Sequence, residues 1–185
     1  PNFVTVAYFQ LEEDNLVDFV AGGQTQPGLS IETDGFEIEA LWNIGDFAVD
    51  FNYRQLDAQD IDVNGVGVTR PSLPEQAGSV WASWTPSVGQ AEGLRVGLGV
   101  RYASENESNG TAFLAANGFA PTPNRVVTDG YTVLDALVAY EFESFEVMLN
   151  LRNLADEEFY ATCLSRGDCF PGEQRTVVAS LISRF

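Results

Sequence analysis

The sequence predicts an all-β fold, an antiparallel transmembrane β-barrel, from three observations. Apolar and polar residues alternate with a period of two along most of the chain. The connections between the alternating segments are long and short in turn, and aromatic residues gather near the segment ends. These features are typical of strands that cross a membrane with one face toward lipid and the other toward a wet lumen.

The alternation defines the strands. In the segment 94–102 the even positions are apolar, whereas the odd positions are arginine or glycine. In the segments 47–54 and 145–152 the odd positions are apolar, and most even positions are polar or charged. Successive side chains of a strand point to opposite faces, so each segment is predicted to be a half-exposed strand. The predicted strands are about 3–12, 29–42, 47–59, 76–86, 94–104, 129–142, 145–154 and 174–185.

The connections between these eight segments differ in length in a regular order. Short connections are predicted at 43–46, 87–93 and 143–144, and long ones at 13–28, 60–75, 105–128 and 155–173. In an antiparallel sheet this order puts every long connection at the same end. Outer-membrane barrels have short periplasmic turns and long extracellular loops. The alternative is a soluble, carbohydrate-binding β-sandwich of the jelly-roll or lectin-like kind, which has no reason to segregate its loops.

Aromatic residues lie near the predicted strand ends, as in the girdles at the two interfaces of a membrane barrel. They are Tyr8, Phe9, Trp42, Phe47, Trp84, Tyr102, Tyr131, Tyr140, Phe142, Phe145 and Phe185. A soluble core places large rings toward strand middles instead. We therefore expect aliphatic residues at mid-strand, such as Leu98 and Leu149, to face lipid.

Composition excludes several classes of function. The 185 residues include 27 acidic and 9 basic ones, which gives a net charge of −18 and a pI near 4.1. Every basic residue is arginine, and lysine and histidine are missing. Nucleic-acid binding through a basic face, Schiff-base chemistry, imidazole catalysis and His-ligated zinc are therefore excluded. We predict no enzyme, no cofactor and no resident metal, and we expect the acidic long connections to be solvated or bridged by divalent cations to lipopolysaccharide.

Two local motifs have plain interpretations. The only cysteines, Cys163 and Cys169, lie in one polar segment. They predict a disulfide formed in an oxidising compartment, and two free thiols are the alternative. The segment Asp60–Gly65 begins like a calcium loop, but its twelfth position is Pro71 instead of glutamate. We interpret it as an acidic surface turn.

The C-terminal part resembles a known family. The segment Asn150-Leu151-Arg152-Asn153-Leu154-Ala155-Asp156-Glu157-Glu158-Phe159-Tyr160 is similar to the last-but-one strand of TonB-dependent outer-membrane receptors, roughly N-x-x-N-L-F-D-x-x-Y. Segments 172–178 and 183–185 resemble the closing loop and final strand, and 35–39 and 130–135 resemble further strands. The cysteine pair followed by Gly-Glu-x-Arg is most similar to the siderophore branch, in particular the ferrichrome-type hydroxamate receptors. Ala155 departs from the pattern, which has an aromatic residue there.

The resemblance implies a barrel of about 22 strands filled by an N-terminal plug, with a TonB-binding box ahead of the plug. Residues 1–185 are then expected to be the C-terminal portion, the last eight strands, without the plug and the remaining strands. The implied function is the binding and TonB-dependent import of a ferric siderophore across the bacterial outer membrane. A complete eight-stranded structural or adhesion barrel is the alternative, and cobalamin, another metal chelate or an oligosaccharide is the alternative substrate.

The resemblance also suggests roles for individual residues. Charged residues that share the lumen-facing side of the predicted strands are expected to form ion pairs that hold the plug, since no nucleophile or metal cluster accompanies them. They are Glu37, Glu39, Asp50, Arg54, Arg95, Arg101, Asp135, Glu146 and Arg152. Substrate contacts are expected from the loop bases, where aromatic surfaces suit a ferric chelate. The candidates are Tyr160, Phe170, Phe159, Phe113, Phe119 and Arg175. In the alternative, the rings only pack the loops and Arg175 only anchors the closing loop.

Overall fold

The structure is a computed structural model that describes residues 2–20, 24–62, 64–87, 89, 91–113 and 115–183. In these residues it contains β-strands and one 3₁₀ helix, η1 (Ala115–Asn117). The strands are β1 (Phe3–Val20), β2 (Gln24–Ile44), β3 (Phe47–Ile61), β4 (Gly67–Thr69), β5 (Gln76–Trp84), β6 (Leu94–Ala103), β7 (Asn106–Phe113), β8 (Pro121–Thr128), β9 (Tyr131–Glu141), β10 (Phe145–Arg152), β11 (Tyr160–Cys163), β12 (Cys169–Pro171) and β13 (Thr176–Ser183). No helix in this described part is long and apolar enough to span a membrane.

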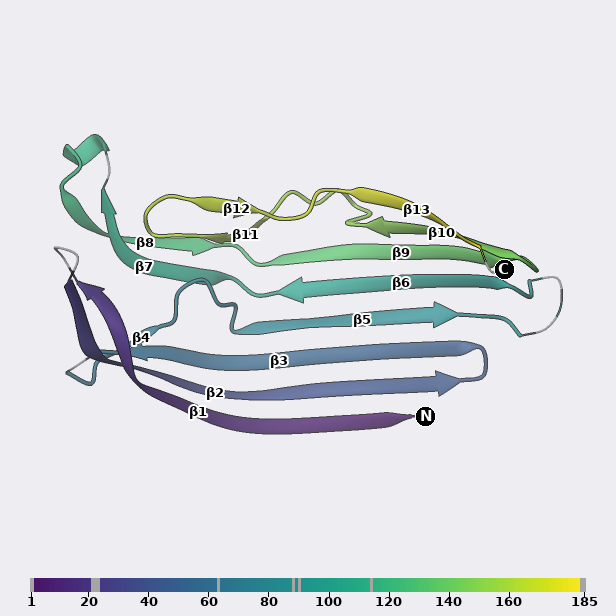
Figure 1. The fold of residues 1–185 in the computed structure, drawn as a ribbon, viewed down its shortest axis with the longest axis horizontal. Helices are drawn as coiled ribbons and strands as arrows, with labels where there is room; N and C mark the ends of the chain where they lie inside the picture. The colour runs from purple at the N-terminus through teal and green to yellow at the C-terminus, as the bar shows by residue number, and fades with distance from the viewer. Residues whose placement is uncertain are drawn as a thin grey trace.

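The large strands form one antiparallel sheet in the order β1-β2-β3-β5-β6-β9-β10-β13, with β4 paired to the end of β3. Each step joins large strands that follow one another along the chain, as in an up-and-down meander, and the remaining strands β4, β7, β8, β11 and β12 lie in the connections between them. All the long connections lie at one end of the sheet, and the short turns lie at the other end with both chain termini (Figure 1). The segregation of loops predicted from the sequence is therefore confirmed.

The eight predicted strands are all present, but the predicted loops are more ordered than expected. Strands β1 and β2 pair as far as Val20 and Gln24, beyond a register shift after Glu13, where the sequence predicted a loop over 13–28. The hairpin β7–β8 occupies most of 105–128, and β11–β12 lies within 155–173. These segments do not alternate regularly between apolar and polar residues, so the period of two in hydrophobicity does not reveal them.

The register assigns each residue to one of two faces, because directly opposite residues of paired strands share a face. The outer face carries Leu98, which lies opposite Ala82 and Ala136, and Leu149, which lies opposite Val138. These leucines are 62% and 37% exposed, and no second layer of the described chain covers them. Both leucines are therefore exposed on a single-layered sheet, as a lipid-facing position requires, and the sandwich alternative is wrong.

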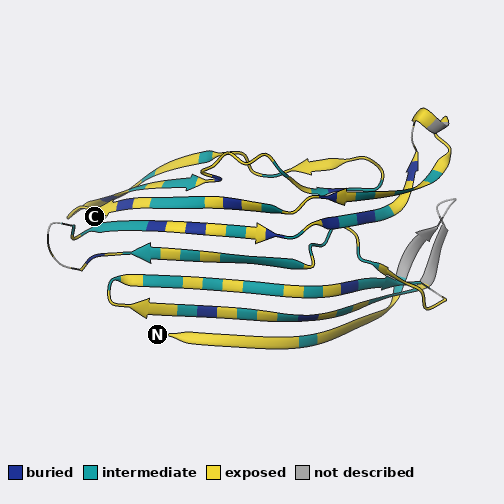
Figure 2. Cartoon of the chain, turned by 180° about the vertical axis from the view of Figure 1, so that it is seen from behind, coloured by how far each residue is buried: buried dark blue, intermediate teal, exposed yellow. Residues whose placement is uncertain are grey.

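Exposed and less exposed residues alternate along the inner strands of the sheet, whereas β1 at its edge is exposed nearly throughout (Figure 2). The inner face carries Arg95, Gly97, Gly99 and Arg101 of β6 and the residues opposite them. A sheet with one apolar and one charged exposed face fits a barrel wall between lipid and water.

Aromatic side chains form two rows on the outer face. Near the short turns, the rings of Phe47 and Trp84 stack at 6.3 Å, and those of Phe142 and Phe145 stack at 4.4 Å. Near the long connections, Phe36 contacts Tyr53 at 5.8 Å. The predicted girdles are present, with three exceptions. Phe9 follows Tyr8 and therefore points to the inner face, Tyr131 lies opposite Ala103 on the inner face, and the terminal Phe185 lies outside the described residues.

One large ring, Trp81 on β5, belongs to the inner face. It lies opposite Gly99, and its indole covers both Gly97 and Gly99, where an added Cβ atom would collide with the ring. The indole therefore packs directly against the backbone of the two β6 glycines. This close approach explains why glycine occupies two alternate positions between Arg95 and Arg101.

We predict that Gly99→Ala destabilises the wall by roughly 1–3 kcal/mol, because the new methyl group displaces the indole. The measurement is thermal unfolding of the full-length receptor in detergent. In a Trp81→Ala background the same glycine substitution should cost much less. An equal loss of unfolding free energy in both backgrounds would show that Gly99 is not required for the packing of the Trp81 indole.

Candidate functional site

Charged side chains on the inner face of β6, β9 and β10 pair with one another across the strands. Arg101 of β6 holds Asp135 of β9 with two hydrogen bonds, of 2.6 and 3.1 Å. Arg95 reaches over β9 to Glu146 of β10, with 2.6 Å between Nη2 and Oε1. This part of the wall therefore neutralises its own charges with short, charge-assisted hydrogen bonds.

The inner face of β2 and β3 is different. Glu37, Glu39 and Asp50 are exposed there. Glu37 lies directly opposite Arg54, yet no ion pair forms between them, and none of the three carboxylates pairs with an arginine of the described chain. The sequence prediction that all these charged residues share one face is confirmed, but only those on β6, β9 and β10 pair within the wall.

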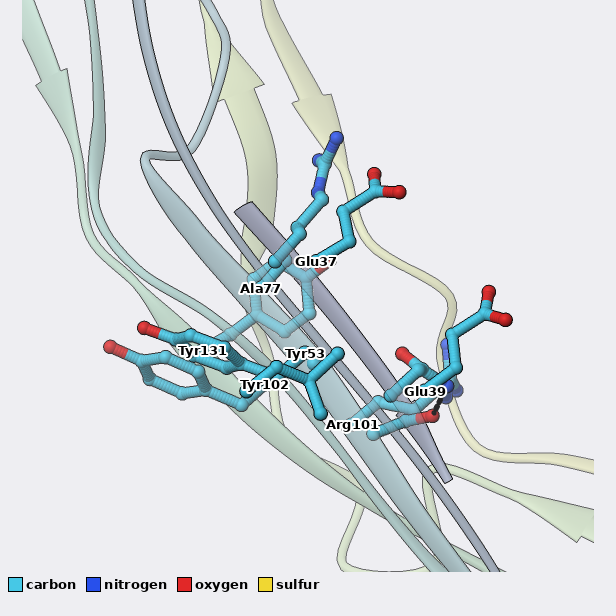
Figure 3. Close-up of a pocket in the computed structure, with 12 residues that line it drawn as sticks. Glu37, Glu39, Tyr53, Ala77, Arg101, Tyr102 and Tyr131 are labelled. Carbon is cyan, nitrogen blue, oxygen red and sulfur yellow. Dashed lines mark hydrogen bonds between the residues drawn. The ribbon is translucent and has the colours of Figure 1, made fainter. Parts of the chain in front are cut away.

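A hollow of about 410 Å³ lies between these two regions, in the half of the wall nearer the long connections. Its lining comes from β2, β3, β5, β6 and the start of β9. Gly78 lies between Tyr53 and Tyr102 in the register, on the outer face behind the hollow, where an added Cβ atom would collide with the backbone of Asn52 and with Tyr53. By the register, Tyr131 shares the inner face with Glu37 and Glu39, whereas Tyr102 belongs to the outer face. The carboxylates of Glu37 and Glu39 accordingly point away from the hydroxyl group of Tyr102 (Figure 3). The hollow thus offers both charged and phenolic groups to a polar ligand.

The connection after β10 is fastened by Asn153, which is 0% exposed. Its Nδ2 donates to the carbonyl oxygens of Glu157 and Glu173, at 2.8 and 2.9 Å, and its Oδ1 accepts from the Glu157 amide. Its own amide donates to Asp135 at 2.9 Å. Asn153 also has φ of 51°, a conformation that asparagine tolerates better than most residues. One residue therefore joins the turn and the closing segment through its side chain and the inner-face carboxylate of β9 through its backbone amide.

Two of the predicted ligand contacts belong to this fastened region. The ring of Phe159 stacks on Tyr131 at 4.1 Å and covers Gly172, which has no room for a side chain. Arg175 bonds Asp156 through both its backbone amide and its Nη2, at 3.2 and 3.0 Å. In the structure Phe159 packs on a ring and Arg175 contacts a carboxylate, and a ligand contact by either residue stays a prediction.

The hairpin β11–β12 rests on the hairpin β7–β8 through polar side chains. Nδ2 of Asn106 donates to the Ala161 carbonyl at 3.1 Å, and the Thr128 hydroxyl accepts from the Cys163 amide at 2.8 Å. Ser108 and Asn124 bind the backbone of Ser165 in the same way. Side chains of one hairpin thus satisfy the backbone groups of the other, where a sheet ladder would otherwise do so. Cys163 and Cys169 are joined in the predicted disulfide.

An ion pair stiffens the hairpin β7–β8 itself. The Arg125 guanidinium and the Asn109 amide both donate to Glu107, and they hold the pKa of that carboxyl below its usual value. The hairpin keeps this pair at every pH above the ordinary carboxyl pKa and loses it as the pH falls through the lowered value.

The calcium-like segment forms a turn in the structure. Asp62 accepts hydrogen bonds from the amides of Val66 and Asn64, both at 2.8 Å, and from the Asn64 side chain. These bonds hold the pKa of Asp62 below its usual value. Asp60 pairs with Arg70 at 2.9 Å. Val63, inside the motif, lies outside the described residues. The carboxylates therefore serve the turn, as the sequence interpretation expected.

The remaining predicted ligand contacts are exposed aromatic rings. Tyr160 and Phe170 lie on the hairpin β11–β12 and are 52% and 47% exposed. Phe113 and Phe119 flank η1 at the tip of the hairpin β7–β8 and are also exposed. The structure therefore brings Tyr160 and Phe170 together on one element and places Phe113 and Phe119 on another.

Comparison with known proteins decides the family. Residues 1–154 match the family model described as TonB dependent receptor-like, beta-barrel. The chain belongs to the TonB-dependent receptor β-barrel family. The family predicted from the C-terminal motifs, and with it the outer-membrane location, is confirmed.

Curated relatives of the family resemble the chain over most of its length. The ferrichrome outer membrane transporter/phage receptor of Escherichia coli K12 is 31% identical over 194 residues, which cover 100% of this chain and 24% of the relative. The ferrioxamine B receptor of Salmonella typhimurium SL1344 is 26% identical over 82% of this chain and 21% of its own length. The chain therefore spans about a quarter of the length of these relatives.

Solved structures of the family have the same fold. The closed form of the ferric-catecholate import receptor Fiu from E. coli K12 superposes with a TM-score of 0.75 and 26% identity, over 98% of this chain and 25% of that one. The pyoverdine receptor FpvA of Pseudomonas aeruginosa PAO1, bound to pyoverdine, gives a TM-score of 0.79 at 19% identity, over 98% and 27% of the two chains. The second likeness shows the fold alone.

Sequence reasoning missed the polar contact between the two hairpins. A signal for it exists, because β7 places Asn106, Ser108, Gly110 and Ala112 at alternate positions. A row of small and polar residues with a period of two indicates a strand face that another backbone approaches closely. Gly110 in fact has no room for a side chain, because the Ser165 hydroxyl lies 2.5 Å from where its Cβ would be.

We predict that Asn153→Ala raises the rate of proteolytic cleavage within 155–173 about tenfold in the full-length receptor. The reason is that loss of a buried, hydrogen-bonded side chain destabilises the local structure by roughly 1–3 kcal/mol. Limited proteolysis with mass spectrometry measures the rate. Asn150→Ala on β10, which removes none of these bonds, is the matched control. Equal protection of both variants would contradict the fastening role.

Proposed function

We propose that this chain is part of the wall of an outer-membrane receptor that binds a ferric siderophore and imports it in a TonB-dependent manner. The observation that carries the proposal is the two-faced sheet with its loops at one end, in a chain 31% identical to a ferrichrome transporter. No covalent step belongs to this function. The protein's contribution is selective binding and a gated route.

Further strands and a plug belong to the same proposal. Among the described residues, β1 pairs only with β2, and β13 pairs only with β10. The unpaired backbone groups of two open edges are not tolerated in hydrocarbon. A closed eight-stranded barrel requires β1 and β13 to pair with each other, so the small-barrel alternative is not supported. Additional strands of the same receptor are the partners that would satisfy both edges, and the exposed charges of the inner face suit a plug.

The binding surface for the chelate is assigned to the loop end. Aromatic rings and a few polar donors suit an organic iron chelate, and the hairpin β11–β12 presents Tyr160 and Phe170 there. The hollow lined by Glu37, Arg54 and Tyr131 lies below the loops, nearer the lumen. A hydroxamate chelate is favoured over a catecholate one because the relatives similar in sequence are named for ferrichrome and ferrioxamine.

We predict that Tyr160→Ala combined with Phe170→Ala raises the Kd of the full-length receptor for a ferric hydroxamate roughly tenfold, through the loss of ring contacts. Titration calorimetry or tryptophan fluorescence measures the change. Phe142→Ala, at the short-turn end of the same wall, is the control and should leave the Kd as it is. Unchanged affinity in the double variant removes both residues from the site.

A further inference from the structure

The inner face of the wall is divided into a self-contained region and an open region. The self-contained region comprises β6, β9 and β10, where Arg95 and Arg101 are engaged by Glu146 and Asp135. Arg152 at the end of β10 pairs with Glu173 at 3.3 Å. A surface whose charges are matched internally needs no charged partner from any other element.

Small and apolar residues beneath these ion pairs are already covered. Ala139 of β9 lies opposite Arg95 and is buried, and Val133 lies opposite Arg101 and is fully buried. On β6 the indole of Trp81 closes the space above the two glycines. The Nε atom of Arg95 has no hydrogen-bond partner among the described residues, but it is buried and therefore out of reach of a plug. A plug that meets this region thus gains little new hydrogen bonding and little new apolar burial.

The open region comprises β2 and β3, and it has the opposite character. Glu37, Glu39 and Asp50 project from it without a cationic partner in the described chain, although both strands lie inside the sheet. Covering a carboxylate with a plug is costly unless the plug supplies a cation or hydrogen-bond donors. A plug that fills the lumen must therefore meet this region with cations or hydrogen-bond donors.

A plug held at β2 and β3 by such contacts separates first from the neighbouring strands that offer it no unmatched charge when it is pulled. We propose that the ferric chelate crosses the barrel along the inner face of β6, β9 and β10, between this self-contained region and the plug. The inference rests on the proposed function, since it requires a plug and a transported chelate. A wall with matched charges also suits passage, because conduction requires binding that is weak enough for release.

Two asparagines provide a matched test in the full-length receptor. Asn150 lies on the inner face of β10, in the self-contained region, and Asn52 lies on the inner face of β3, in the open region. Each is replaced by cysteine, as Asn150→Cys and Asn52→Cys, and a bulky membrane-impermeant maleimide is added to cells. The labelling rate is measured at rest and during energised uptake of radiolabelled ferrichrome, and uptake after labelling is compared with that of the same variant before labelling.

The proposal predicts that labelling of Asn150→Cys accelerates several-fold during uptake and that the attached label then stops uptake while ferrichrome binding persists. Labelling of Asn52→Cys should stay slow throughout. The inference is overturned if labelling accelerates at Asn52→Cys instead, or if it accelerates equally at both positions, which would indicate that the whole plug leaves. It is also overturned if labelling accelerates at neither position while uptake continues. A parent receptor that binds and imports none of the ferric siderophores offered contradicts the proposed function itself, which separates the two failures.

Discussion

The whole structure depends on one constraint, which is that a backbone in hydrocarbon must satisfy its hydrogen bonds within the protein. Strands meet this constraint by pairing edge to edge, and each pairing fixes a register. Because side chains alternate, the register then decides which residues meet lipid and which meet the lumen. In this wall, a shift of β6 by one residue would turn Arg95 and Arg101 into the membrane and Leu98 into the lumen. The charge pairs and the apolar face therefore specify the same register.

The inner face turns this register into function. Pairs such as Arg101 with Asp135 bind strands to one another, and Asn153 extends the same network into the closing segment. The hairpins at the loop end are connected by side chains that satisfy backbone groups. Ion pairs and hydrogen bonds thus connect the strands and the loop hairpins of the wall, whereas the carboxylates of β2 and β3 stay available to bind another element of the receptor.

Much of this architecture is predictable from the sequence, and the exceptions have a common cause. Alternation located every membrane-crossing strand, because lipid on one face and water on the other impose a period of two. Beyond the membrane that contrast vanishes, so the paired extension of β1 to Val20 and the hairpin β7–β8 had no hydrophobic signal. The motif around Asn153 identified the family but not the bonds that make it a fastener. Phe159 illustrates the limit for the site, since only coordinates show its ring on Tyr131.

The central claim is that lipid wets one face of this sheet and a plugged lumen the other. Leu149 and Asn150 are neighbours in β10 that point to opposite faces. Cysteines at these positions, each carrying a bimane label in the full-length receptor in nanodiscs, are exposed to lipids brominated on their acyl chains. The account predicts strong quenching of the label at 149 and little at 150. Equal quenching at both positions, or stronger quenching at 150, would contradict it.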